Sequence, residues 1–139
     1  MPRLRVVALA NRLPAWAESA CADYATRMPR GYELERVLLK PGGRAAQRLR
    51  AAVPRGARMI ALDERGRDLT TAQFAPLLAQ ETAFLIGGAD GLDPALKRDA
   101  ALLIRLSALT LPHALAQLVL VEQIYRAATL LTGHPYHRA

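Results

Sequence analysis

Apolar and polar positions divide this chain into short apolar runs and longer segments with helical spacing. Runs rich in apolar and β-branched residues predict strands at residues 4–10, 32–39, 59–62, 83–86 and 102–106. Apolar residues three or four positions apart predict helices at residues 16–28, 44–53 and 71–80, from residue 94 onward, and at residues 114–131. Because strand and helix follow one another in turn, the sequence predicts an α/β fold with a mostly parallel sheet and helices on both faces.

Several residues refine these boundaries and faces. Residues typical of helix starts and ends lie where the pattern places them: Thr70 or Thr71, Asp93 followed by Pro94, Pro112, and Gly133. The polar residues 63–66 predict a turn after the third strand. Trp16 and Cys21 are predicted to face the core from the first helix. Arg44 and Arg48, four residues apart, are predicted to share one face of the second helix.

The last helix, residues 114–131, is apolar almost all the way round. Such a helix needs cover on several sides, either inside a core or at a subunit interface, and a single domain of 139 residues can hardly provide all of it. We therefore expect a subunit interface. Glu122, Gln123 and Arg126 interrupt the apolar run, no signal-peptide cleavage site follows the first residues, and Cys21 is the only cysteine. These features predict one domain, residues 1–139, in a cytoplasmic protein with no membrane contact.

Positive charge is concentrated in one part of the chain. Residues 27–67 contain eleven basic and four acidic residues, an excess equal to the net charge of +7 of the whole chain. Between Arg36 and Arg58 seven basic residues occur without an acidic one. A segment of this kind binds phosphates by releasing counterions, which favours a nucleic-acid partner. Only two of the nineteen basic residues are lysine, and heavy arginine use can also reflect genome composition.

Three predicted strands end in segments that can form one ligand-binding corner. These segments are Leu62 with Asp63, the glycine-rich residues 87–91, and residues 106–111. In open α/β sheets ligands bind beyond the carboxyl ends of the strands. The glycine-rich segment lacks both the dinucleotide-binding spacing and the lysine of a phosphate loop, which argues against NAD and ATP. A tight turn explains the double glycine equally well.

The end of the chain, residues 133–138, is also unusual in composition. It contains two histidines, an aromatic residue and an arginine, which suit contact with a nucleotide. The alternatives are a frayed terminus and a metal site, and for a metal no Cys, Asp or Glu lies close enough in sequence to complete a ligand set, so we expect none. His113 can either enter the pocket or serve only the start of the last helix.

Four strings in this chain together resemble one known family. They are Leu-Ile-Gly-Gly-Ala-Asp-Gly-Leu at residues 85–92, Leu-Ser-Ala-Leu-Thr-Leu-Pro-His at residues 106–113, Tyr-Arg-Ala at residues 125–127 and His-Pro-Tyr-His-Arg at residues 134–138. The chain is similar over its full length to the large-subunit ribosomal RNA methyltransferase H family, SPOUT-class enzymes that methylate N3 of a pseudouridine. It departs from the family pattern at Ala89-Asp90, where members often have Pro-Glu, and at Ala114 and Gln117, where they have proline and arginine.

The resemblance implies a SPOUT-type trefoil-knotted α/β fold, whereas the pattern alone indicates an ordinary doubly wound sheet, since true knots are rare. It also implies a homodimer that binds S-adenosylmethionine (SAM) in the knot loops and methylates 23S rRNA, with the assembled ribosome as the expected substrate. The implied cofactor-binding residues are Leu62, Gly87, Leu106, Ser107, Ala108, Leu109, Thr110 and Leu111. The candidate catalytic residues are His113, Arg126, Tyr136, His137 and Arg138. Residues 134–138 of one subunit are expected to close over the cofactor of the other.

Within this resemblance, roles in proton transfer stay open between several side chains. Arg126 or Arg138 can favour the anion of the imide, and His113 or His137 can remove its proton. Three other functions are compatible with the residues. They are methylation of transfer RNA or another ribosomal nucleotide, ribosome assembly through RNA binding without catalysis, and nucleotide binding by a regulatory module.

Overall fold

The computed structural model describes residues 3–138, and within that range five strands form one parallel sheet. The strands are β1 Arg3–Leu9, β2 Glu33–Leu39, β3 Arg58–Asp68, β4 Thr82–Ile86 and β5 Leu102–Arg105, in the spatial order β2-β1-β4-β3-β5. All five residues of the central strand β4 are buried. The predicted α/β fold with a parallel sheet is confirmed, and the uninterrupted apolar run of β4 reflects cover on both faces.

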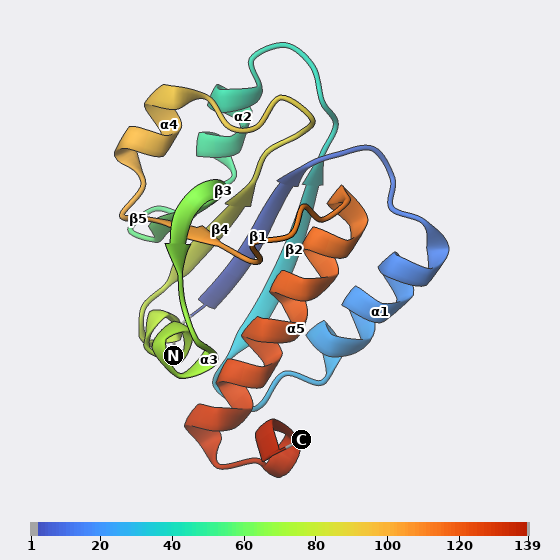
Figure 1. Ribbon diagram of the computed structural model, residues 1–139, viewed down its shortest axis with the longest axis vertical. Helices are drawn as coiled ribbons and strands as arrows, with labels where there is room; N and C mark the ends of the chain where they lie inside the picture. Colours follow the sequence, from blue (N-terminus) through green and yellow to red (C-terminus); the bar gives the residue numbers. More distant parts are fainter. Residues whose placement is uncertain (1–2, 139) are drawn as a thin grey trace.

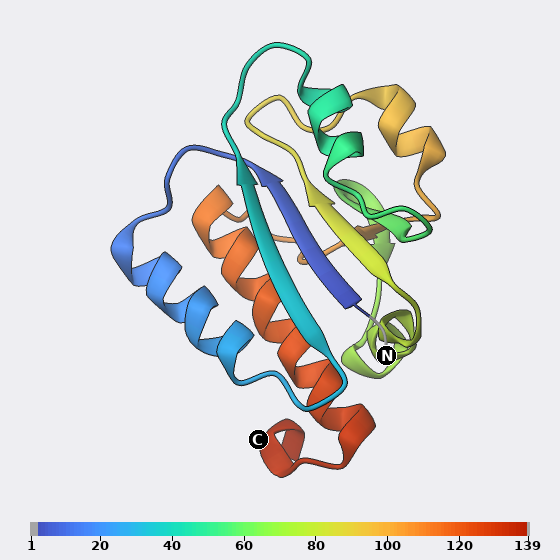
Figure 2. The ribbon, with the colours of Figure 1, turned by 180° about the vertical axis from the view of Figure 1, so that it is seen from behind.

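Helices cover both faces of this sheet (Figures 1 and 2). On one face lie α1 Ala15–Thr26 and α5 His113–Thr132, and on the other α2 Ala45–Ala51 and α4 Pro94–Asp99. The short helix α3 Thr71–Phe74 and the 3₁₀ helix η1 Ala75–Ala79 connect β3 to β4. Strand residues alternate between the two cores: Val6 packs with α1 and α5, and Val7 packs with Leu49 of α2.

Most of the predicted helix ends are where the sequence places them. Thr70, the first of the two candidates, caps α3: its Oγ1 accepts from the backbone N–H of Gln73 (3.1 Å), whose side chain in turn accepts from the N–H of Thr70. Asp93 caps α4 through the N–H of Ala95 (2.8 Å). Pro112 occupies the cap position of α5, one residue before the first helical residue. Gly133 ends that helix with φ of 76°.

The prediction of a turn at residues 63–66 was wrong. β3 continues to Asp68, and both Leu62 and Arg67 pair with Ile104 of β5, so residues 63–66 bulge out of one continuous strand. An ion pair between Asp68 and Arg105 (2.6 Å) joins the extended part of β3 to β5. Polar residues can stay in this strand because β5 is at the edge of the sheet and the bulge faces solvent.

Two side-chain placements also differ from the prediction. Trp16 is 55% exposed, and the residues that α1 buries are Ala17 and Cys21. The small side chain of Ala17 allows α1 to pack closely against α5, which turns Trp16 outward. Arg44 has a left-handed conformation (φ of 60°) and precedes α2, so it does not share a helical face with Arg48.

Helix α5 is less completely covered than a core helix. It buries one side against the sheet and α1, and it leaves Leu115, Leu130 and Leu131 between 37% and 43% exposed. By length and hydropathy alone, α5 meets the criterion for crossing a membrane, but helices that pack on a sheet, as this one does, meet it too. Three apolar side chains of α5 thus remain partly exposed to solvent in the single chain.

Candidate active site

The predicted convergence of three strand ends is confirmed: they surround one cavity of about 1280 Å³ at the carboxyl edge of the sheet. All eight residues that the sequence singles out for cofactor binding line it: Leu62, Gly87, Leu106, Ser107, Ala108, Leu109, Thr110 and Leu111. His113, the first residue of α5, lines it as well. Strands β3, β4 and β5 are direct or next neighbours in the sheet, so the segments that follow them meet at one place.

The segment between β5 and α5 forms the apolar wall of this cavity. Ser107 Oγ accepts a hydrogen bond from the backbone N–H of Leu109 (2.9 Å), which closes a tight turn. The turn leaves Leu109 77% exposed, while Leu106 and Leu111 are half-buried. A non-helical segment with free backbone N–H and C=O groups beside leucine side chains can bind a flat ring by its faces and its edge.

The glycine-rich segment after β4 forms the opposite wall and folds back on itself. Gly88 and Gly91 form an antiparallel bridge, with a hydrogen bond from the N–H of Gly91 to the carbonyl of Gly88 (3.0 Å). A Cβ at Gly87 would lie 2.5 Å from the carbonyl carbon of Gly91 and 2.8 Å from the nitrogen of Leu92. The double glycine is thus a tight turn and a cavity wall at once, and Gly87 is required by a close backbone approach.

His113 has a specific partner at the start of α5. The side-chain amide nitrogen of Gln117 lies 2.7 Å from His113 Nε2, and Gln117 is almost completely buried. An amide nitrogen only donates, so Nε2 accepts and the ring proton resides on Nδ1. Burial lowers the pKa of His113 below its usual value, which keeps the ring neutral at neutral pH. Gln117, one of the departures from the family pattern, therefore fixes the ring and tautomer of His113.

Sequence reasoning missed the part of the cavity wall that follows β1 and β2. Asn11, Arg12 and Pro41 line the cavity in addition to the three predicted segments. β1 lies directly beside β4 in the sheet, so its carboxyl end opens on the same edge. The order of the strands, which the local pattern does not contain, is what brings these residues to the site.

Arg126 and Tyr136 are not in this cavity. Arg126 lies thirteen residues after His113 in α5, or about 20 Å along the helix, and Tyr136 contacts Glu122 and Tyr125 in the middle of that helix. The backbone of residues 135–138 forms the 3₁₀ helix η2, Pro135–Arg138, while the side chains of His137 and Arg138 lie outside the described part. Of the three candidate catalytic residues whose side chains are described, only His113 lines the cavity of its own chain.

Tyr136 is bound tightly to its own chain. Its hydroxyl donates to Glu122 Oε2 (2.8 Å) and lies 3.2 Å from the hydroxyl of Tyr24. Its ring packs edge-on against Tyr125, with centroids 4.7 Å apart, and the guanidinium of Arg126 lies 5.0 Å from its centroid. Burial and these hydrogen bonds raise the pKa of Tyr136 far above its usual value, so it stays a neutral donor.

Glu122 connects Tyr136 with Arg126, whose Nη2 is 2.8 Å from Glu122 Oε2. Tyr24 and Glu122 were not predicted to belong to the site. Tyr24 is far from Tyr136 in sequence, and Glu122 looks like an interruption of an apolar helix. Neither residue therefore carries a local sequence signal of a role in the site. Among the described residues, no group of three or more His, Cys, Asp or Glu side chains could bind a metal.

Comparison with known proteins assigns this fold and site to a class. A family model described as "Predicted SPOUT methyltransferase" matches residues 2–137, and the chain belongs to this family. Within it, the chain is 50% identical to "Ribosomal RNA large subunit methyltransferase H" of Polynucleobacter asymbioticus, over 98% of this chain and 99% of that protein. The protein of the same name from Ralstonia pickettii is 47% identical, over 98% and 99% of the two chains. The resemblance seen in the sequence is confirmed.

A solved structure shares the fold at much lower identity. The structure titled "Structural insights into the 2-OH methylation of C/U34 on tRNA" superposes with a TM-score of 0.59 at 20% identity, over 95% of this chain and 98% of that chain. At this identity the likeness shows the fold alone.

Proposed function

We propose that this protein transfers a methyl group from SAM to N3 of a pseudouridine in 23S rRNA, on the assembled ribosome. As a SPOUT methyltransferase closely related to rRNA methyltransferases, it methylates rRNA with SAM as the donor. The observation that supports methyl transfer at this site is the cavity itself: all eight cofactor-binding residues implied by the family resemblance line it. The choice of acceptor rests on the family resemblance. SAM supplies an electrophilic methyl group on a sulfonium.

The residues present fit this cofactor. Leu62, Leu106 and Leu111 offer an apolar slot for adenine, and the free backbone groups of residues 106–111 can bind its edge and the ribose. Gly87 allows the glycine-rich wall to fold back on itself, because a Cβ at this position would lie 2.5 Å from the carbonyl carbon of Gly91. The chain binds and orients the donor so that the methyl group is in line with the nucleophile, and this positioning can supply most of the catalysis.

The nucleophile, an imide nitrogen, must lose a proton before it attacks. His113 lines the cavity with a ring kept neutral by burial, and we assign it a role that requires this neutral form. To remove the proton, its Nε2 must first release the hydrogen bond from Gln117. Arg126 of α5 and Arg138 of the tail would stabilise the imide anion, and His137 is the other candidate base. Since neither Arg126 nor Tyr136 lines the cavity of its own chain, the proposal requires a homodimer in which the partner's tail closes the cavity.

The uncovered leucines of α5 support this homodimer, because a partner helix would bury them. The proposal also includes a single domain and a trefoil knot at the cavity loops. Since the substrate is rRNA, the proposed location is the cytoplasm, where ribosomes assemble and act. A small chain suits a large, preassembled substrate that provides most of the recognition surface.

The assignment is tested by the identity of the methylated nucleotide. Labelled SAM is incubated with the protein and with assembled ribosomes, separated small subunits and transfer RNA, and the RNA is digested to nucleosides. We expect label in the large-subunit RNA alone, as 3-methylpseudouridine. Label in transfer RNA, or in a different nucleoside of the large subunit, would contradict the proposal.

The role of neutral His113 predicts a change in pH dependence for Gln117→Glu. A carboxylate beside His113 Nε2 favours the protonated ring, so the pKa of His113 should rise. Because only the neutral form is active, the acidic limb of kcat against pH should move to higher pH. Gln117→Met, which removes the hydrogen bond without adding charge, should leave the limb near its original position. An unmoved limb in Gln117→Glu would assign that limb to another group.

A further inference from the structure

We propose that Arg12, Lys40 and Arg44 form a phosphate-binding rim that holds the RNA backbone beside the methyl-transfer cavity. This inference rests on the proposed function and names the surface that binds its substrate. It follows from three observations: which basic side chains of the chain already have partners, where the remaining ones lie, and how charge is distributed around the mouth of the cavity.

Much of the basic segment between Arg36 and Arg58 serves the fold. Both terminal nitrogens of Arg36 donate hydrogen bonds to the carboxylate of Glu18 (2.9 and 3.0 Å), and Arg50 forms an ion pair with Asp99 (2.6 Å). Arg58 donates to the carbonyl of Leu77 (2.6 Å). Within residues 3–138, no carboxylate pairs with the other four: Lys40, Arg44, Arg48 and Arg55. The free positive charge of the segment is therefore smaller and more localised than its composition indicates.

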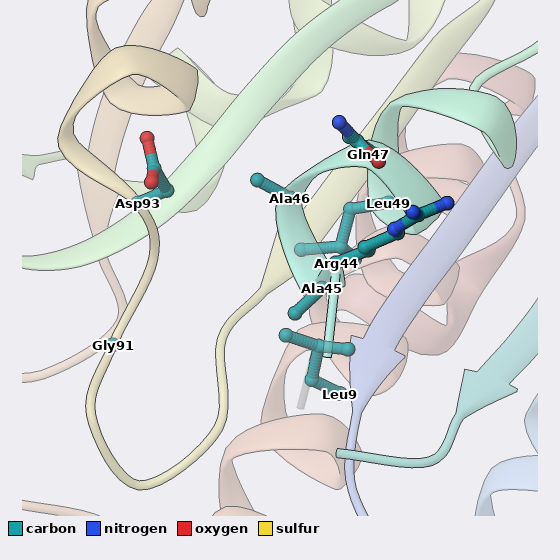
Figure 3. Close-up of a pocket in the computed structure, with 8 residues that line it drawn as sticks. All are labelled: Leu9, Arg44, Ala45, Ala46, Gln47, Leu49, Gly91 and Asp93. Atoms are coloured by element: carbon teal, nitrogen blue, oxygen red, sulfur yellow. The ribbon is translucent and has the colours of Figure 1, made fainter. Parts of the chain in front are cut away.

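Topology divides these cations between two edges of the sheet. Lys40 directly follows β2 and precedes Pro41, which lines the main cavity, and Arg12 lines the same cavity after β1. Arg44 lines a second, smaller cavity of about 380 Å³ against α2 (Figure 3). Leu9 and Gly91 line both cavities, so the two are adjacent. Arg55, in contrast, lies between α2 and the start of β3, at the opposite edge.

The side chains of the rim are free to reach a ligand. Arg12, Lys40 and Arg44 are all exposed, and no ion pair holds any of them within the described residues. In the smaller cavity the Arg44 side chain extends away from Asp93 on the facing segment (Figure 3). Asp93 is occupied in capping α4, so it does not neutralise Arg44.

The rest of the cavity mouth has no such excess of positive charge. On the side of β3 and β4, Lys97 lies 3.7 Å from Asp63, and Arg105 pairs with Asp68. Arg65 follows Asp63 and Glu64 in the same bulge. The positive field is thus confined to the side of β1 and β2, next to the cavity. Three exposed cations in this arrangement suit a chain of phosphates better than the single carboxylate of a small cofactor.

The test compares Lys40→Gln/Arg44→Gln with the matched control Arg55→Gln, in the full-length protein. All three residues are exposed and belong to the same basic segment, but only the first two lie at the cavity edge. With ribosomes as substrate, the double variant should show a KM for ribosomes raised at least about tenfold, since each lost contact is charge-assisted. Its kcat and its affinity for SAM should change less than about twofold. Arg55→Gln should have the KM of the wild type. The charge-conserving variant Lys40→Arg/Arg44→Lys should also keep the KM for ribosomes close to that of the wild type.

Sedimentation of the protein with ribosomes at increasing salt measures binding without catalysis. The affinity of the wild type for ribosomes should fall steeply with salt. In a plot of the logarithm of the binding constant against the logarithm of the salt concentration, the slope of the double variant should be smaller by about 0.7 for each phosphate contact removed. Equal weakening by Arg55→Gln would overturn the rim and leave only a diffuse positive charge. A raised Kd for SAM in the double variant would reassign these cations to the cofactor. Absence of methyl transfer in the wild type would instead contradict the proposed function. The sedimentation result would still show whether the rim binds the ribosome.

Discussion

Gly87→Ala is expected to lower methyl transfer at least about 100-fold by closing the cofactor cavity. The added Cβ would lie 2.5 Å from the carbonyl carbon of Gly91 and 2.6 Å from its oxygen. These are backbone atoms of a segment held by the bridge between Gly88 and Gly91, so relief requires the whole segment to move. Movement of this wall misplaces the donor, and a misplacement of about 1 Å is enough for a loss of this size. Calorimetric titration with SAM and single-turnover methyl transfer measure the two effects.

Gly88→Ala is the matched control for this prediction. A Cβ at Gly88 would meet only the carbonyl oxygen of Leu9, at 3.6 Å, and the Cβ of Leu9, at 3.9 Å, which are ordinary contacts. Its methyl transfer should stay within a few-fold of the wild type. Thermal unfolding of both variants shows whether the loss is local. Unchanged SAM binding in Gly87→Ala would contradict the assignment of this wall to the cofactor.

Mixing two inactive variants is expected to restore activity if the tail works in the partner's cavity. The first variant is Gly87→Ala, with a damaged cavity and an intact tail. The second is His137→Ala/Arg138→Ala, with an intact cavity and a damaged tail, in a chain that keeps the Tyr136 contacts. In a mixed dimer, the intact cavity of the second chain receives the tail of the first. One of the two sites in each mixed dimer is then intact, so isolated mixed dimers should have about half of the wild-type activity.

This experiment follows from the separation of His113 and Tyr136 within one chain: His113 lines the cavity and Tyr136 does not. Tyr136 is held against the middle of α5 by Glu122, Tyr24 and Tyr125, so it does not reach the cavity of its own chain. The two chains, carrying different tags, are produced together so that mixed dimers can be isolated. Each variant alone, produced in the same way, is the control. If the mixed dimers stay as inactive as either parent, the tail acts within its own chain or not at all.

The parts of the site that could be predicted from sequence are those with a local signal. An uninterrupted apolar run marks the central strand β4, and the glycines that follow it mark a tight turn. The string from Leu106 to His113 has turn chemistry between a strand and a helix, and it forms a cavity wall. In these places the strand, the turn and the ligand site all depend on residues adjacent in sequence, so a short window contains the necessary information.

Other features depend on contacts between distant residues, and there the sequence misled or was silent. The bulge at residues 63–66 reads as a turn, but pairing with β5 keeps these residues in one strand. Trp16 has helical spacing with the core residues, but close packing of α1 on α5 turns it outward. Arg12 and Pro41 reach the cavity only because β1 and β2 occupy particular places in the strand order.

The charge that each basic residue leaves available also depends on contacts between distant residues. From composition, the segment between Arg36 and Arg58 is one uniformly positive block. In the folded chain, Arg36 and Arg50 are neutralised by Glu18 and Asp99, residues that lie outside the block in sequence. Which cations remain available to RNA is thus a property of the tertiary structure, although their total number is a property of the sequence.

The central claim is methyl transfer to pseudouridine in 23S rRNA, and one measurement tests it most directly. Ribosomes that lack the methyl group are incubated with the protein and labelled SAM, alongside ribosomes that also lack the pseudouridine. We expect label in the large-subunit RNA of the first preparation and none in the second, because N3 of this base is the proposed acceptor. Label in both preparations, or in neither, would contradict the claim.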